Sequence, residues 1–236
     1  MTVAPRATRP RAFAFPARRR RAIGLLAFAG AAAGLGTAVV LGADSAPAPT
    51  EPSIVPLRIS SGQGIATGFA LADGRVVTVA HVLDGPVTVA GHRVRVVRVD
   101  RRNDLALLSA PGVGAGSPDI AAGAPDTAAA PEFASAASGE HLRVVRLRAG
   151  GRSALSVHLA RSIVAHVRAP GAARALVRPA LELSVAEPRG HVAPGDSGAA
   201  VVTDSGEVAG IVFAASRNRA DTAYAVDASR LRHLLR

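Results

Sequence analysis

From residue 54 onward, short apolar runs alternate with turn residues, a pattern typical of an all-β protein. The runs are rich in valine, leucine and alanine, and β-strands have this length and composition. Turns are predicted at Ala72-Asp73-Gly74 and at Asp84-Gly85-Pro86. The first set of expected strands is 54–60, 64–71, 75–80, 86–90, 92–99 and 104–109. Six strands in so short a stretch predict a small closed barrel.

A second set of strands follows a stretch with few large apolar residues. Residues 110–139, rich in Ala, Gly, Pro and Ser, are interpreted as a connection with one or two short strands of its own. Residues 228–235 are predicted to form a terminal helix, capped by Asp227 or Ser229 and docked through Leu231, Leu234 and Leu235. The expected strands of the second set are 142–149, 153–168 (one strand or two), 175–185, 198–203, 207–215 and 222–226.

The region before residue 54 has a different pattern. Residues 1–21 are rich in Arg, Pro and Ala, and no stable fold is expected there. Residues 22–43 carry no charge, and as a helix they would span about 33 Å, enough for a bilayer core. The preceding arginines would keep the N-terminus in the cytoplasm and place the rest outside. We expect an uncleaved single-pass anchor followed by a Pro-rich tether over 44–53; the alternative is a signal peptide whose cleavage releases a secreted protein.

Charge and composition narrow the function classes. Every basic residue is arginine, and residues 54–236 carry 21 arginines against 15 acidic residues. This small excess of positive charge, together with the few aromatic residues, is not typical of a nucleic-acid-binding protein. No nucleic-acid partner is therefore expected. The chain has no cysteine, and its histidines and carboxylates show no metal-ligand spacing. We therefore expect no disulfide, no metal and no cofactor.

The candidate chemistry centres on the segment Gly195-Asp196-Ser197-Gly198, just before an apolar run. Glycine on both sides allows a sharp turn and lets a substrate come close to the backbone. Such a turn can aim consecutive N–H groups at one point, as an acyl-transfer site requires for a developing oxyanion. Four short polar residues also make an ordinary loop, so a base and an orienting acid are needed elsewhere in the chain.

Both are present upstream. His81 ends the apolar run 76–80, and Asp104 stands directly before the apolar Leu105-Ala106-Leu107-Leu108. Asp100 is the competing acid, but it lies in a more polar run. The order His, Asp, Ser is one of the known orders of a catalytic triad.

With these motifs in place, the chain resembles the trypsin-like (chymotrypsin-fold) serine proteases over about residues 54–236. It is most similar to the compact bacterial branch that includes Deg/HtrA-type and membrane-tethered acid-resistance proteases, and no PDZ domain is expected. The motifs that carry the resemblance are Gly64-Ile65-Ala66-Thr67-Gly68-Phe69, Thr78-Val79-Ala80-His81, Asn103-Asp104-Leu105-Ala106-Leu107-Leu108, Gly195-Asp196-Ser197-Gly198 and Gly206-Glu207-Val208-Ala209-Gly210-Ile211-Val212.

The resemblance implies an all-β fold of two six-stranded antiparallel β-barrels, at about 54–112 and 113–227, followed by a C-terminal helix. It implies that Ser197 is the nucleophile, His81 the general base and acid, and Asp104 the residue that orients the imidazole. The oxyanion hole would be formed by the backbone N–H groups of Gly195 and Ser197.

The resemblance also suggests which residues contact the substrate. The strand that pairs with the substrate main chain would be formed by Val212, Phe213, Ala214 and Ala215. The primary pocket would be lined by His191, Ala215 and Thr222, with no acid to select Arg or Lys. A small or apolar P1 residue is expected, and His191 is also compatible with an acidic one.

Three departures from the family pattern affect the site. The nucleophile loop continues with Ala199-Ala200 where relatives have Gly-Pro. Phe213 stands where many relatives have a hydroxyl residue that supports the triad aspartate, so Asp104 needs other partners. The Ile-Val-Gly-Gly start of zymogen-type relatives is absent, so Asp196 is expected to pair with an arginine or with backbone donors.

The function expected from all of this is a serine endopeptidase that acts on proteins or peptides outside the cytoplasmic membrane. The alternative is a latent or non-catalytic module of the same fold that binds peptides or senses a signal while tethered to the membrane.

Overall fold

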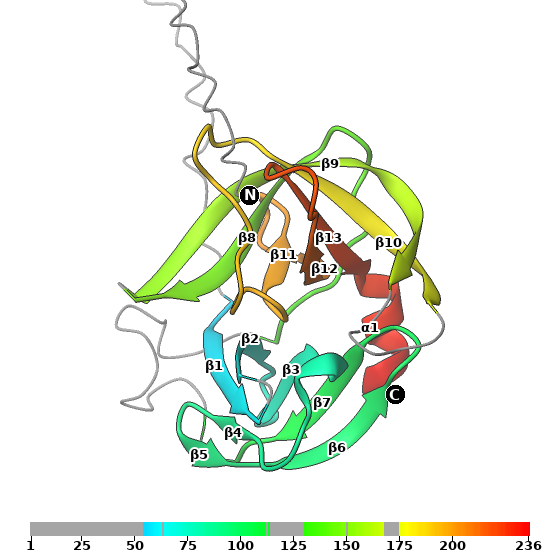
Figure 1. The fold of residues 1–236 in the computed structure, drawn as a ribbon. Coiled ribbons are helices and arrows are strands. Elements are labelled where there is room, and N and C mark those ends of the chain that lie inside the picture. The colour runs from blue at the N-terminus through cyan, green and yellow to red at the C-terminus, as the bar shows by residue number, and fades with distance from the viewer. Residues whose placement is uncertain (1–53, 63, 112, 114–129, 150, 168–174) are drawn as a thin grey trace, which may run out of the picture. The chain divides into compact units, whose positions relative to one another are not determined.

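The computed structural model describes residues 54–62, 64–111, 113, 130–149, 151–167 and 175–236 (Figure 1). All of them belong to one compact unit, residues 45–236. The predicted anchor at 22–43, the basic segment before it, the tether and most of the connection at 110–139 lie outside the described residues. Within the described ranges, no helix has the length and apolar character needed to cross a membrane.

The first half of the unit is one curled antiparallel sheet with the strand order β5-β4-β1-β2-β3-β7-β6. It has seven strands, so the prediction of six is wrong in that detail. The expected strand 92–99 divides at Val94, whose N–H donates to Val87 O, and Ala90 and Gly91 form a tight turn with positive φ at both residues. The strands are β1 (Pro56–Ser61), β2 (Gly64–Ala70), β3 (Arg75–Val79), β4 (Thr88–Val89), β5 (His92–Arg93), β6 (Arg95–Asp100) and β7 (Leu105–Ser109).

The second half is a closed six-stranded barrel with the order β10-β13-β12-β11-β8-β9. The stretch 153–168, expected as one strand or two, belongs to a single long strand that pairs with β8 over Gly151–His158 and with β10 over Val157–Val167. The strands are β8 (His141–Arg148), β9 (Gly151–Val167), β10 (Leu176–Val185), β11 (Ala200–Val202), β12 (Val208–Ala215) and β13 (Thr222–Asp227).

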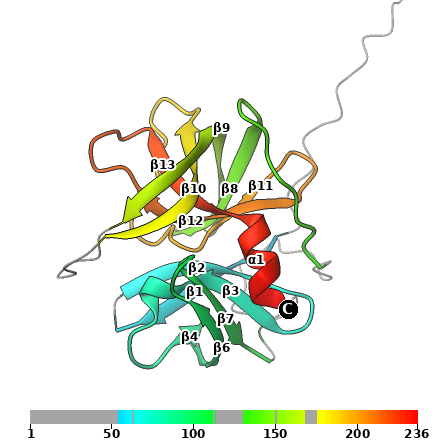
Figure 2. The same ribbon diagram turned by 90° about the vertical axis from the view of Figure 1, so that its right-hand side faces the viewer.

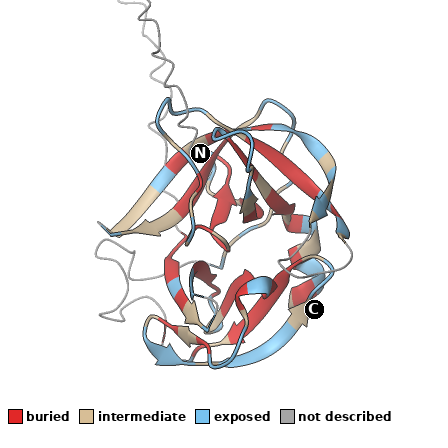
Figure 3. Cartoon of the chain, viewed as in Figure 1, coloured by how far each residue is buried: buried red, intermediate tan, exposed pale blue. Residues whose placement is uncertain are grey.

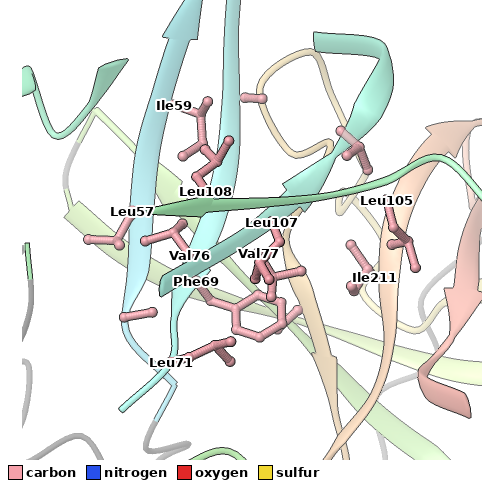
Figure 4. Close-up of a cluster of buried hydrophobic side chains, with 14 of the residues drawn as sticks. Leu57, Ile59, Phe69, Leu71, Val76, Val77, Leu105, Leu107, Leu108 and Ile211 are labelled. Atoms are coloured by element: carbon pink, nitrogen blue, oxygen red, sulfur yellow. The ribbon is translucent and has the colours of Figure 1, made fainter. Parts of the chain in front are cut away.

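Alternation of apolar side chains along the strands produces two buried clusters. One fills the concave face of the first sheet, where Leu57, Phe69, Val77 and Leu107 lie together, and it reaches Ile211 on β12 of the barrel (Figure 4). The other fills the barrel itself. In Figure 3 the buried residues lie along the inner faces of both sheets. The first cluster therefore joins the two sheets through packed side chains.

A single helix ends the chain. The helix α1 (Ala228–Leu235) begins after Asp227, whose carboxylate accepts a 2.7 Å hydrogen bond from Ser229 N. Leu231 and Leu234 are buried against the sheets, and Leu235 is half-buried. The helix contacts β6 and β7 of the first sheet and β12 and β13 of the barrel (Figure 2). The predicted all-β, chymotrypsin-like fold with a C-terminal helix is confirmed, but the first of the two predicted barrels is a curled sheet that does not close in the described part of the chain, because β5 and β6 at its two edges are not paired with each other.

Candidate active site

His81 and Asp104 are brought together by the pairing of two neighbouring strands. His81 lies in the one-turn 3-10 helix η1 (Ala80–Val82) directly after β3, and Asp104 directly precedes β7. Because β3 and β7 are antiparallel, with Val79 opposite Leu105, the end of one strand lies beside the start of the other. The N–H of Ala80 donates to Asp104 O at 3.0 Å.

Two hydrogen bonds fix the histidine on the aspartate. His81 Nδ1 lies 2.8 Å from Asp104 Oδ2, and the backbone N–H of His81 donates to Asp104 Oδ1 at 2.8 Å. The Asp104 side chain is buried, while the His81 side chain is 45% exposed. A carboxylate at Nδ1 favours the tautomer with hydrogen on that nitrogen, which leaves Nε2 to accept a proton. An accessible imidazole held in this way can act as a general base.

Asp104 achieves this position with an unusual backbone conformation. Its φ is 60°, in the left-handed region that non-glycine residues rarely adopt. Asp is one of the residue types that tolerate this region best. The β3–β7 pairing on one side and the bonds to His81 on the other hold Asp104 in this conformation.

The loop that carries Ser197 is attached to the first sheet through Thr67 on β2. The N–H of Thr67 donates to Ser197 O at 2.8 Å, and the Thr67 hydroxyl donates to Gly195 O at 2.7 Å. On the barrel side, Gly198 N donates to Val212 O at 2.7 Å. Thr67 belongs to the motif 64–69, from which no role for it was predicted, and in the structure it bonds Gly195 and Ser197 of the nucleophile loop.

Gly198 lies so close to β2 that no side chain fits there. A Cβ at this position would be 1.9 Å from Thr67 O and 2.7 Å from Thr78 Oγ1, and φ is +89°. Gly195 also has a positive φ of +97°, but nothing lies within 4 Å of a Cβ there. The glycine after the serine therefore serves close packing, and the one before it serves the turn.

The N–H groups expected to form the oxyanion hole are not used in hydrogen bonds within the described residues. Within the described part of the chain, the N–H groups of Gly195 and Ser197 donate to no protein acceptor, and the Ser197 hydroxyl makes no hydrogen bond. Backbone donors without a protein partner are available to a ligand. The hydroxyl is also available, but it is not hydrogen-bonded to His81.

Asp196 is fully buried and pairs with two arginines of β8. Its Oδ2 lies 2.7 Å from Arg148 Nη2 and 3.4 Å from Arg146 Nη1, and it accepts from Ala193 N at 3.0 Å. The expected pairing with an arginine or backbone donors is confirmed, and both kinds of partner are present. The nucleophile loop is thus anchored without an N-terminal amine.

Asp104 has a third partner that sequence reasoning missed. Arg178 Nη1 on β10 lies 3.2 Å from Asp104 Oδ2, and the Arg178 side chain is 3% exposed. Its guanidinium carbon stands 5.3 Å from the ring centre of Phe213. The signal in the sequence was an arginine inside an apolar strand, but nothing in the sequence indicates its partner 74 positions away.

The residues expected to bind the substrate main chain lie on a strand edge. Val212 is bonded to the nucleophile loop, with its N–H donating to Ala199 O at 2.9 Å. Phe213 is buried at a bulge, and Ala214 and Ala215 pair with β13. Because β11 pairs with β12 only as far as Ile211, the other edge of residues 213–215 has no strand partner among the described residues. An extended peptide can add to such an edge.

Of the three residues expected to line the primary pocket, His191 lies in a pocket that the other two do not line. His191 is exposed in a pocket of about 790 Å³ together with Arg146, Arg148, Glu187 and other residues of the 187–191 loop. Thr222 is buried and donates to Asp221 Oδ1 at 3.1 Å, and Ala215 is exposed. Neither Thr222 nor Ala215 lines the His191 pocket.

The turn before Asp104 is held by its own hydrogen bonds. Asn103 donates to the Asp100 carboxylate from its backbone N–H at 3.0 Å and from its side chain at 2.6 Å. Partial burial acts to raise the pKa of Asp100, but these bonds, with the Arg102 charge, outweigh it and hold the pKa below its ordinary value. Asp100, the competing candidate acid, thus supports the turn, while Asp104 bonds His81.

Two curled antiparallel sheets with a C-terminal helix, and a His–Asp pair beside a Gly-Asp-Ser-Gly loop, define the serine-type endopeptidases of the chymotrypsin fold. A model of the trypsin-like peptidase domain family matches residues 66–211, more than half of the chain. The chain belongs to this family, which confirms the resemblance drawn from the motifs. Its substrates are peptides or proteins.

Solved structures of bacterial proteases share the fold. The Rv3671c protease from M. tuberculosis, in its active form, is 28% identical over 79% of this chain and 80% of its own, with a TM-score of 0.62. The MamO protease domain from Magnetospirillum magneticum is 16% identical over 80% and 98%, with a TM-score of 0.58. The HtrA-type protease AlgW with tripeptide is 18% identical over 78% of this chain and 59% of its own, with a TM-score of 0.56. The last two likenesses concern the fold. No curated protein matches the chain.

Proposed function

We propose that this endopeptidase hydrolyses peptide bonds through a triad of His81, Asp104 and Ser197. The observation that carries the proposal is the pair of 2.8 Å contacts by which the buried Asp104 holds His81 at its Nδ1 and its backbone N–H. An imidazole anchored at Nδ1 presents Nε2, the nitrogen a general base needs, and Ser197 lies in the adjoining loop tied to β2.

The reaction follows from these roles. Ser197 Oγ forms a bond to the scissile carbonyl carbon while its proton passes to His81 Nε2. The tetrahedral intermediate collapses to an acyl ester as the peptide C–N bond breaks and His81 returns the proton to the leaving amine. Water, deprotonated by His81, then adds to the ester carbonyl; the C–Oγ bond breaks, His81 returns the proton to Ser197 Oγ, and the carboxylic acid product leaves. Asp104 stays ionised and stabilises the imidazolium in both halves.

The backbone supplies the remaining parts. The unoccupied N–H groups of Gly195 and Ser197 would bind the oxyanion, and residues 212–215 would pair with the substrate main chain. His191, Ala215 and Thr222 would set the P1 preference for a small or apolar residue, with an acidic one tolerated through His191.

The peptidase domain would act outside the cytoplasmic membrane, held by a helix over 22–43. The uncharged run after an arginine cluster supports this placement. Fractionation of expressing cells, with protease added from outside, tests it. Full-length protein in the membrane fraction with its C-terminal domain digested supports the anchor. Protein of reduced mass in the medium supports signal cleavage, and full-length protein in the cytosol rejects both.

Hydrolysis of an internally quenched peptide library by the full-length chain tests the triad proposal. Cleavage is expected from the wild type and from Ser205→Ala, a control that removes a serine from the β11–β12 turn. Ser197→Ala should abolish it. Cleavage that survives Ser197→Ala would contradict the proposal.

One observation favours a latent form as the second candidate. The Ser197 hydroxyl makes no hydrogen bond to His81 within the described residues. In free enzymes this contact is often long and tightens only on substrate binding. A folded wild type that cleaves no library peptide would favour the latent or peptide-binding module.

A further inference from the structure

We infer that Arg178 is a positioning residue for the triad: its charge holds the Asp104 carboxylate in the place where the same oxygen contacts His81. The inference rests on the triad proposed above. It assigns a function to a buried charge that the family motifs do not contain.

The contact is direct and enclosed. Arg178 Nη1 lies 3.2 Å from Asp104 Oδ2, and this same oxygen lies 2.8 Å from His81 Nδ1. The side chains of Arg178 and Asp104 are 3% and 8% exposed. Water therefore screens the pair poorly, and the charge of Arg178 acts on Asp104 and, through it, on His81.

Phe213 supports the guanidinium from β12. The guanidinium carbon stands 5.3 Å from the Phe213 ring centre, a distance at which a cation and an aromatic ring attract each other. The ring of Phe213 therefore helps to hold the guanidinium in the place where it contacts the Asp104 carboxylate.

The arrangement brings little stability of its own. Arg178 Nε and Nη1 have no hydrogen-bond partner in the described part of the chain, because the contact with Asp104 lacks hydrogen-bond alignment. Burying a guanidinium with so few partners is costly, and such pairs are often replaced by apolar residues without loss of stability. The consequence that distinguishes Arg178 is thus its electrostatic effect on the triad.

The sign of this effect is the same for both titrating groups. A fixed positive charge opposes the addition of a proton to Asp104 and also to His81. The surrounding segments contribute other charged side chains: Asp84 after η1, and Asp100, Arg101 and Arg102 in the turn before Asp104. Asp100 is bonded to Asn103, and β12 contributes the uncharged Phe213. Removal of Arg178 should therefore move the loss of activity on acidification to higher pH.

The test compares Arg178→Met, which removes the charge, with Arg178→Lys, which keeps it. Arg161→Met is the matched control, because Arg161 is a 65% exposed arginine on β9 whose partner is Glu182. Two readouts are taken across pH on the full-length chain. One is the ¹³C titration of the His81 ring among the seven histidines, assigned with His81→Ala; the other is the rate of labelling by a fluorophosphonate probe.

Arg178→Met should raise the midpoint of the His81 titration and the acid limb of labelling by about 0.5 to 2 pH units, the size expected for one nearby charge in a partly screened site. Arg178→Lys should keep the wild-type midpoint while labelling more slowly at its plateau, since an ammonium cannot stack as a guanidinium does. Arg161→Met should match the wild type in both readouts.

An unchanged His81 midpoint in Arg178→Met would overturn the inference, whether or not the enzyme labels. If Arg178→Met does not fold, Arg178→Gln takes its place. Failure of both neutral variants to fold while Arg178→Lys folds would also overturn it, in favour of a structural role. A wild type that titrates as expected but is never labelled would reject the triad proposal and leave the inference about the His81–Asp104 pair intact.

Discussion

At the scale of single residues, the close contact between Gly198 and β2 is the most exacting feature of the site. Gly198→Ala would place a Cβ 1.9 Å from Thr67 O, so the nucleophile loop must move away from the first sheet. Gly206→Ala is the matched control, with a similar φ of +93° and nothing within 4 Å. The control should cost about 1–2 kcal/mol in free energy of unfolding.

The Gly198→Ala variant should cost clearly more than Gly206→Ala and should abolish labelling by a fluorophosphonate probe. Urea unfolding and labelling of both variants give the comparison. Equal losses of stability, or a Gly198→Ala variant labelled at the wild-type rate, would show that the loop does not depend on this contact.

The ion pair between Asp196 and Arg148 gives a second prediction. Arg148→Met leaves the buried Asp196 with Arg146, whose Nη1 is 3.4 Å away, so the loop should be held less firmly. Labelling should slow by about tenfold, which corresponds to about 1.4 kcal/mol. Arg189→Met removes a charge from the same pocket without touching Asp196 and should label normally. Equal slowing in both variants would assign the effect to pocket charge rather than to the ion pair.

The sequence predicts a site residue best when the signal lies in the residues next to it. His81 and Asp104 were identified because each adjoins an apolar strand, and the strand pairing does bring them into contact. The sequence does not show which arginines contact Asp196, or that Arg178 contacts Asp104, because these contacts join segments that are distant along the chain. The left-handed backbone conformation of Asp104 could not be predicted either, because the position is not a glycine, the residue type that usually indicates a positive φ.

At the scale of elements, the terminal helix offers a clean test of packing. Leu231 is fully buried, whereas Leu235 is only half-buried. Leu231→Ala should cost about 2–5 kcal/mol in free energy of unfolding, and Leu235→Ala clearly less. Denaturant unfolding of the two variants checks this. A Leu235→Ala loss as large as that of Leu231→Ala would mean that the helix docks through a different face.

The turn between β6 and β7 gives a prediction on pH. The Asn103 bonds lower the pKa of Asp100 in the folded state. The stability they add is therefore present above the unfolded pKa of about 3.9 and is lost as pH falls through the lower folded value. Asn103→Ala should be less stable than the wild type at pH 7, and the difference should shrink below about pH 4. A difference that stays constant with pH would contradict this account.

The apolar pattern predicts where strands lie better than it predicts how many there are. Most expected strands coincide with observed ones within a few residues, because alternation and turn residues are local signals. The stretch 92–99 became two strands because Val94 bonds Val87 in an adjacent segment. The prediction for 153–168 left one strand or two open, since only the pairing with β8 and β10 keeps so long a strand continuous.

At the scale of the whole molecule, the charge around the 187–191 loop bears on substrate choice. Arg146, Arg148, Arg189 and His191 share one pocket with Glu187, whose carboxylate accepts from Ser156 N, and the buried Asp196 offsets part of the charge of Arg146 and Arg148. Substrates with Arg or Lys at P1 should therefore be the poorest in a positional library, and small or apolar residues the best, with acidic ones accepted. A strong preference for Arg or Lys at P1 would contradict the prediction.

The central claim is that Ser197 is a nucleophile activated by a histidine that Asp104 holds. The most direct measurement treats the full-length chain with a fluorophosphonate probe and locates the adduct by peptide mass mapping. One adduct is expected, on the peptide that contains Ser197, and it should be lost in Ser197→Ala and in His81→Ala. An adduct on another residue, or equal labelling of Ser197 without His81, would contradict it.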